Sequence, residues 1–297
     1  MSEPIESTLI PTDGSTGALA GANVGVALAS RIGADVHVLS VVGPRNGPVE
    51  SDDAVRSSLE EGAEEAVEAV ANAARNYDEE LDVTTAVRWG TPFQAIREYA
   101  VRREIDVIAM GTKGRTGLDR VLLGSVTENV LRTARTPVLA VPPDAGVSEP
   151  GEVALERLLL PTDGSDGAAI ATEWGIALAT RLESMVHAVY SVDTSRLSGD
   201  RAPEDLIRAL ERHGKAALEA VRERAEEADV GVSESIATGP PARVVLAYAS
   251  DRDADLIVMG THGQTGIGQW FLGSVTENVV RGADVPVFCV PVSAASP

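Results

Sequence analysis

The sequence predicts an α/β protein of two tandem domains, each a five-stranded parallel, doubly wound sheet with helices on both faces. Two observations support this. First, the chain repeats itself, since LIPTDGS at 9–15 returns as LLPTDGS at 159–165. Second, short apolar runs alternate with longer amphipathic runs in each copy, a pattern typical of parallel strands joined by helical crossovers. The length of 297 residues allows about two domains.

A longer motif fixes the period of the repeat. MGTKGRTGLDRVLLGSVTENV at 110–130 returns as MGTHGQTGIGQWFLGSVTENV at 259–279, and PVLAVP at 137–142 returns as PVFCVP. A period of about 150 residues is too long for a solenoid and indicates two homologous domains. We place these domains at 1–146 and 147–297, joined near DAGVSEPGEVALE.

Each element of the first copy follows from its own pattern. After the apolar run STLIPT, Val24, Leu28 and Ile32 recur at helical spacing, as Trp174, Leu178 and Leu182 do in the second copy. The last strand begins at Pro137, or at Pro286 in the second copy, which suits a sheet edge. The full pattern predicts strands at 7–12, 36–42, 81–89, 106–111 and 137–141, and helices at 15–32, 52–76, 92–103 and 125–134.

The expected topology places two unusual stretches together. With right-handed crossovers and strand order 3-2-1-4-5, ligands bind beyond the carboxyl ends of the strands, between strands one and four. Asp13 follows the first strand, and Gly111 to Gly114 follow the fourth. Val41 ends the neighbouring second strand, where the second copy has Ser191.

These residue types suit a phosphorylated ligand. We expect Gly111, Gly114 and Gly124 to let backbone approach a bulky ligand and to adopt positive φ. The helix that starts near Ser125 offers free N–H groups and the positive end of its dipole, which together form an anion site. Asp13 is placed to accept hydrogen bonds from ribose hydroxyls.

Plainer interpretations exist for two of these features. The spacing of Ser125 and Glu128, repeated by Ser274 and Glu277, also fits a capping box, which would explain the serine without a ligand. Asp13, like Asp163, could simply cap the first helix of its domain. A capping box leaves the glycines unexplained, and that difference favours a binding site.

The pattern Gly111-x2-Gly114-x9-Gly124-Ser125, with Pro11-Thr12-Asp13 after the first strand, resembles the ATP-binding branch of the universal stress protein family. The resemblance covers essentially both copies. It implies that Asp13 and Gly111 meet ribose, that the Val41 main chain meets adenine, and that Gly114, Gly124, Ser125 and Val126 hold phosphates. The predicted site residues are Pro11, Thr12, Asp13, Val41, Met110, Gly111, Gly114, Gly124, Ser125 and Val126 in the first copy, and Pro161, Thr162, Asp163, Ser191, Met259, Gly260, Gly263, Gly273, Ser274 and Val275 in the second.

The resemblance also implies partners. The ligand is ATP or a related adenine nucleotide, with Mg²⁺ carried by the phosphates and no metal site in the protein itself. The strands at 137–141 and 286–290 are expected to pair the two halves as an intramolecular pseudo-dimer, and a homodimer is possible. Lys113 and Arg115 become His262 and Gln264 in the second copy, which offers phosphate less positive charge.

Composition excludes several classes of protein. Forty-five Asp and Glu against 25 Lys and Arg give a net charge of −20, which argues against nucleic acid as a partner and suggests a salt-rich cytoplasm. No long apolar run or secretory signal is present, so we expect a cytoplasmic protein away from membranes. We expect His37 and His187 in the core, His213 solvated, and the single Cys289 buried and inert.

Three functions remain open. The first is a nucleotide-binding stress or signalling module whose output is a change of conformation or assembly. The second is a slow ATPase or self-phosphorylating enzyme with Ser125 or Thr127 as acceptor, although no placed general base is visible beside Asp13. The third is an interaction scaffold with vestigial sites. Neither a Walker loop nor a nucleophile elbow occurs, so catalysis is the less favoured interpretation.

Overall fold

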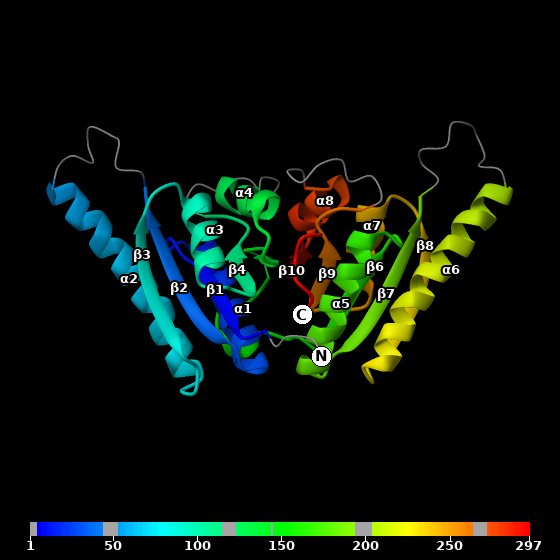
Figure 1. Ribbon diagram of the computed structural model, residues 1–297, viewed down its shortest axis with the longest axis horizontal. Helices are drawn as coiled ribbons and strands as arrows, with labels where there is room; N and C mark the ends of the chain where they lie inside the picture. The colour runs from blue at the N-terminus through cyan, green and yellow to red at the C-terminus, as the bar shows by residue number, and fades with distance from the viewer. Residues whose placement is uncertain (1–4, 44–52, 115–122, 144, 194–203, 264–271) are drawn as a thin grey trace. The chain divides into compact units, whose positions relative to one another are not determined.

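The computed structural model describes residues 5–43, 53–114, 123–143, 145–193, 204–263 and 272–297. Contacts within the chain divide it into two compact units, Pro4–Val153 and Ala154–Pro297, called here the first and second unit. Figure 1 shows that strands and helices alternate along the chain in both units. In the part of the chain that is described, no helix is long and apolar enough to cross a bilayer.

The first unit contains a parallel sheet in the order β3-β2-β1-β4-β5. This is the predicted order, and it brings the carboxyl ends of β1 and β4 together. Its elements are β1 (Ser7–Pro11), α1 (Thr16–Ile32), β2 (Asp35–Val42), α2 (Asp53–Tyr77), β3 (Val83–Trp89), α3 (Pro92–Arg102), β4 (Val107–Gly111), α4 (Ser125–Thr133), β5 (Val138–Val141) and the short 3-10 helix η1 (Pro150–Glu152).

The second unit repeats this arrangement in the order β8-β7-β6-β9-β10, again with parallel neighbours. Its elements are β6 (Arg157–Thr162), α5 (Asp166–Leu182), β7 (Met185–Val192), α6 (Glu204–Glu227), β8 (Val232–Thr238), α7 (Pro241–Asp251), β9 (Leu256–Gly260), α8 (Ser274–Gly282) and β10 (Val287–Val290). The predicted α/β class with tandem doubly wound sheets is therefore confirmed.

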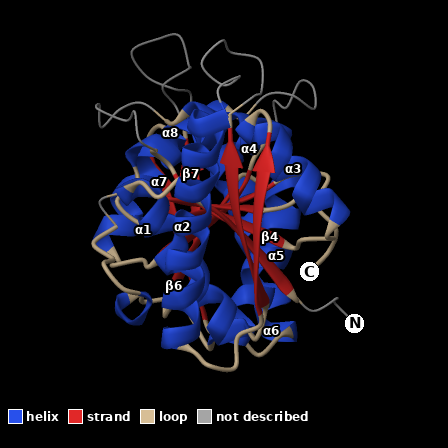
Figure 2. Cartoon of the chain, turned by 90° about the vertical axis from the view of Figure 1, so that its left-hand side faces the viewer, coloured by secondary structure: helices blue, strands red, loops and turns tan. Residues whose placement is uncertain are grey.

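Figure 2 shows helices packed around the strands. In the first unit α1 packs on β1, β4 and β5 and touches α2, whereas α3 packs on β2 and touches α4. The central strands read as continuous apolar runs because helices cover both their faces. Every residue of β4 and β5 is accordingly buried.

Helix α1 packs closely on the sheet because it presents glycines to it. Gly17, Gly21 and Gly25 are spaced four apart and so share one face of the helix. A Cβ on Gly21 would lie 2.6 Å from the carbonyl carbon of Met110, and one on Gly25 would lie 2.7 Å from Cβ of Ala109. The start of α1 is thereby fixed against the end of β4, where the predicted site lies.

Candidate functional site

The carboxyl ends of β1, β2 and β4 open into one cavity of about 850 Å³, counting the space at its mouth. Residues from opposite ends of the first unit's sequence meet there, because parallel strands end at the same edge of a sheet. All ten residues predicted for the first copy line this cavity: Pro11, Thr12, Asp13, Val41, Met110, Gly111, Gly114, Gly124, Ser125 and Val126.

Asp13 is one of the residues that line this cavity, and it lies two residues before the N-cap of α1. Its Oδ1 accepts hydrogen bonds from the Ser15 amide at 3.0 Å and the Ser15 hydroxyl at 2.5 Å. The hydroxyl oxygen of Ser15 in turn caps α1 by accepting from the Ala18 amide. The alternative in which Asp13 caps the helix is therefore wrong.

The second carboxylate oxygen of Asp13 lies beside the loop that follows β4. A Cβ built on Gly114 would lie 3.1 Å from Asp13 Oδ2. In the second unit Ser165 likewise caps α5, while Asp163 Oδ1 accepts from the Ser165 amide at 3.0 Å. Both acidic residues thus occupy the same place between the first and fourth strands of their units.

The N-cap residue of α4 is Gly124, which has no side chain with which to cap the helix. Ser125 is the first helical residue, and among the described residues no side chain forms a capping hydrogen bond there. Glu128 instead pairs with Arg132 at 2.7 Å. The capping-box interpretation is therefore wrong, because Ser125 lies one position too far along the helix to cap it.

The second unit repeats this uncapped start. Gly273 is the N-cap residue of α8, and no side chain in the described part of the second unit forms a capping hydrogen bond there. Glu277 pairs with Arg281 at 2.6 Å. The first amides of a helix have no partner within the helix, so both starts are suited to bind an anion.

The glycines at the end of β4 and before α4 have a different role from the one expected. Positive φ occurs at Gly14 and Gly164, both at 75°, whereas Gly124 has φ −61°. The expectation of positive φ at Gly111, Gly114 and Gly124 is wrong, since none of them is among the residues with positive φ. These positions need glycine for space instead.

Close packing explains that need. A Cβ on Gly111 would lie 2.6 Å from the carbonyl carbon of Gly17, and one on Gly124 would lie 3.1 Å from the Thr112 carbonyl oxygen. In the second unit a Cβ on Gly260 would lie 2.7 Å from the carbonyl oxygen of Gly167. The missing side chains therefore let α1 and α4 approach the end of β4, and their equivalents approach β9.

Two hydrogen bonds tie the start of α4 to the end of β4. The Thr127 hydroxyl donates to the Gly111 carbonyl at 2.7 Å, and the Gly124 amide donates to the Thr112 carbonyl at 2.8 Å. The second unit has the same pair, from Thr276 to Gly260 at 2.8 Å and from Gly273 to Thr261 at 2.8 Å. The uncapped helix start is thus held at the strand end by hydrogen bonds in both units.

An apolar wall completes the first cavity and was missed from the sequence. Leu39 of β2 lines it two residues before Val41, on the same face of the strand. Pro92 and Ile96 line it from the first turns of α3, at helical spacing. The alternation in the strand and the four-residue spacing in the helix are both visible in the sequence, so this wall could have been predicted. Ala18, Lys113 and Thr127 are the remaining lining residues that the predicted set lacked.

The second unit departs from the first at two positions of this site. The Ser191 hydroxyl, where the first unit has Val41, donates to the Gly239 carbonyl at 2.7 Å. His262, which replaces Lys113, has its Nδ1 3.0 Å from the Thr261 hydroxyl. Its Nε2 is buried and has no hydrogen-bond partner among the residues that the structure describes. The further exchange of Arg115 for Gln264 lies outside the described residues.

Two of the histidines considered from the sequence, and the single cysteine, do not join the site. His37 is half-buried with Nδ1 3.0 Å from the Tyr99 hydroxyl, and burial, followed by the charge of Arg103, lowers its pKa. His187 is buried, as expected, and burial lowers its pKa as well. Burial raises the pKa of Cys289 to about 12, which fits the inert thiol that we expected.

Comparison with known proteins matches both units to one protein family. The model of the universal stress protein family matches residues 5–142 and 154–291. A universal stress protein of Methanocaldococcus jannaschii is 38% identical over 143 residues, which cover 47% of this chain and 84% of that protein. One from Mycobacterium bovis is 30% identical over 223 residues, which cover 73% of this chain and 72% of that protein.

A solved structure extends the likeness to the whole chain. The crystal structure of a universal stress protein from Archaeoglobus fulgidus has a TM-score of 0.75 to this chain at 23% identity. The match covers 98% of this chain and 100% of the other chain. At this level of identity the likeness shows that the fold is shared.

Proposed function

The chain belongs to the universal stress protein family, and from that premise we propose that it binds ATP at one site in each unit. The observation that carries the proposal is the cavity of the first unit, where the uncapped start of α4 faces the carboxylate of Asp13. An anion-binding helix end and a hydroxyl-binding carboxylate in one cavity match the phosphate and ribose of a nucleotide.

The lining residues divide into three groups that suit the three parts of a nucleotide. The first-turn amides of α4, the hydroxyl of Ser125 and the Gly114 backbone would bind phosphates. The carboxylate of Asp13 would accept from ribose hydroxyls. Leu39, Val41, Pro92 and Ile96 provide an apolar wall against which a base can pack. The second site would use the corresponding residues from Pro161 to Val275.

Mg²⁺ would arrive with the phosphates and neutralise part of their charge. The output that we propose, in the cytoplasm, is a change of conformation or assembly, because α1 rests directly on the loop that would hold the ligand. A shift of the loop at Gly111 to Gly114 would therefore be felt by α1. The assembly that responds to the nucleotide would be one of two kinds. It would be a pairing of β5 with β10, each the last strand of its own unit, or a pairing of two chains.

Self-phosphorylation is a weaker candidate. Thr127 is 3% exposed and its hydroxyl donates to the Gly111 carbonyl, so it is poorly placed as an acceptor. Ser125 is exposed at the helix start and is the better acceptor of the two. The carboxylate of Asp13 already accepts two hydrogen bonds from Ser15 through Oδ1, which favours a binding role over that of a general base.

The test is to denature purified protein and identify the nucleotide it releases, then to titrate the emptied protein with ATP and GTP by calorimetry. We expect adenine nucleotide in the extract and a preference for ATP in the titration. Protein that carries no nucleotide and does not bind added ATP would favour the scaffold. Single-turnover assays with γ-labelled ATP test whether the protein is an enzyme. Label on Ser125 would favour self-phosphorylation, and rapid phosphate release would favour an ATPase.

A further inference from the structure

In the second unit, a histidine of α6 contacts the turn that carries Asp163. Nε2 of His213 lies 3.2 Å from the main-chain oxygen of Asp163, and a Cβ on Gly164 would lie 3.0 Å from the same nitrogen. A carbonyl oxygen can only accept, so Nε2 of His213 carries the hydrogen. His213 is exposed, as the sequence predicts, and it also contacts the turn after β6.

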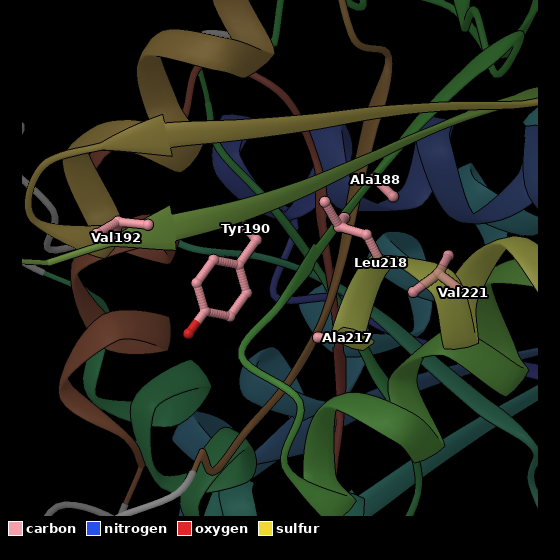
Figure 3. Close-up of a cluster of buried hydrophobic side chains, with 6 residues drawn as sticks. All are labelled: Ala188, Tyr190, Val192, Ala217, Leu218 and Val221. Carbon is pink, nitrogen blue, oxygen red and sulfur yellow. The ribbon is translucent and has the colours of Figure 1, made fainter. Parts of the chain in front are cut away.

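Tyr190 of β7 holds that imidazole in place. The two rings meet edge to face, with centroids 6.0 Å apart and planes at 70°. Tyr190 is 6% exposed and packs against Ala217 and Leu218 of α6 (Figure 3). Burial, and then the carboxylate of Asp163, raise the pKa of the Tyr190 phenol, which therefore stays neutral beside the turn.

The first unit lacks this pair at the equivalent positions. The β2–β7 equivalence aligns Tyr190 with Ser40, and the match of VEAV at 67–70 with LEAV at 218–221 aligns His213 with Gly62. Next to His213, Gly214 provides room for the tyrosine, since a Cβ there would lie 2.5 Å from Tyr190 Cδ1. The first unit has Ala63 at that position, and the small Ser40 at the position of the tyrosine.

Three neighbouring positions on two elements therefore differ together, and the differences fit one another sterically. We propose that His213 is a positioning residue of the second site, holding the Asp163 turn in the geometry that binds ribose. The proposal rests on nucleotide binding at that site. It makes ribose recognition in the second unit dependent on α6, whereas Gly62 of the first unit has no side chain to play this part.

The experiment uses the full chain with Gly124→Val to silence the first site, and compares ATP with 2′,3′-dideoxy-ATP by calorimetry. Adding His213→Gly should weaken ATP binding roughly three- to tenfold, the range expected for one lost hydrogen bond. Binding of the dideoxy analogue, which Asp163 cannot recognise through ribose hydroxyls, should change less than twofold by the same reasoning. His213→Gln, which keeps an N–H donor at similar reach, should restore ATP binding, and Lys215→Gln on the same helix is the matched control.

The outcomes separate this proposal from the function on which it rests. The positioning role would be overturned if His213→Gly lowered the affinity for ATP and for the dideoxy analogue equally, or if His213→Gln did not restore ATP binding. Either result would leave nucleotide binding intact. A Gly124→Val chain that binds no ATP, when the parent chain binds one equivalent, would show that the second site is not a nucleotide site. That result would overturn the proposal together with the one-site-per-unit function.

Discussion

A Cβ atom on Gly17 of α1 would lie 2.9 Å from the carbonyl carbon of Lys113, and closer still to its oxygen. The two residues are far apart in sequence, yet their backbones are in direct contact. Lys113 belongs to the loop that lines the first cavity, and Gly17 lies in the first turn of α1. The shape of this loop is therefore coupled to the packing of the first helix.

Gly17→Ala should consequently damage both stability and binding. The added methyl must displace backbone, and overpacking of this kind costs roughly 1–3 kcal/mol of unfolding free energy. We expect a lower urea midpoint and weaker ATP binding at the first site. Gly62→Ala is the matched control, because a Cβ there has nothing within 4 Å and should stabilise α2 by about 0.5–1 kcal/mol. Similar effects of the two substitutions would contradict the packing argument.

The first site should bind ATP more tightly than the second. Lys113 lines the first cavity, whereas His262 keeps Nδ1 near the Thr261 hydroxyl and has its Nε2 buried. Lys113 is only partly buried, and a solvent-accessible charge is worth about 0–1 kcal/mol, so the difference should be at most about fivefold. Titration of Gly124→Val and Gly273→Val chains gives each affinity separately. A second site that binds as tightly as the first would refute the prediction.

Acid should weaken the fold through two histidines. The pKa values of His37 and His187 lie below their usual value of 6.5 in the folded chain, chiefly because of burial. The unfolded chain then binds more protons, so their contribution is complete above pH 6.5 and is lost as the pH falls from there toward the folded values. Urea unfolding at several pH values measures this loss. As the pH falls, the free energy of unfolding should decrease less for the variant with His37→Gln and His187→Gln than for the parent. An unchanged slope would show that other groups control the acid response.

The acidic composition should make stability depend on salt. A net charge of −20 repels itself most strongly in the compact state. Salt shortens the screening length from about 10 Å at 0.1 M to about 3 Å at 1 M, which removes most of that repulsion. Thermal unfolding should therefore occur at higher temperature as potassium chloride rises over this range. A midpoint that stays constant or falls would leave the acidic composition without this explanation.

The repeat, the strand order and the grouping of the site residues were predictable because they depend on period and topology. LIPTDGS and its copy mark the end of the first strand in each unit, and the order of a parallel sheet places those ends beside the fourth strand. Asp13 and Gly111 could therefore be brought together without any knowledge of side-chain packing.

Features that depend on one residue of register or on distant packing were not predictable. Ser125 and Glu128 have the spacing of a capping box, and only the helix start at Ser125, with Gly124 as N-cap, shows that the box does not form. A glycine looks the same in sequence whether it permits positive φ, as Gly14 does, or close approach, as Gly111 does. The contact of His213 with Asp163 joins two elements whose packing no local pattern specifies.

The central claim is that each unit holds one nucleotide, and ATP stoichiometry tests it most directly. A Cβ at position 124 or 273 would lie 3.1 or 3.0 Å from the carbonyl oxygen of Thr112 or Thr261, so Gly124→Val and Gly273→Val should each distort the helix start of their own unit. Circular dichroism checks that the variants remain folded, and calorimetry counts the sites. We expect two ATP per parent chain and one per single variant. Two sites in either variant, or none in the parent, would contradict the account.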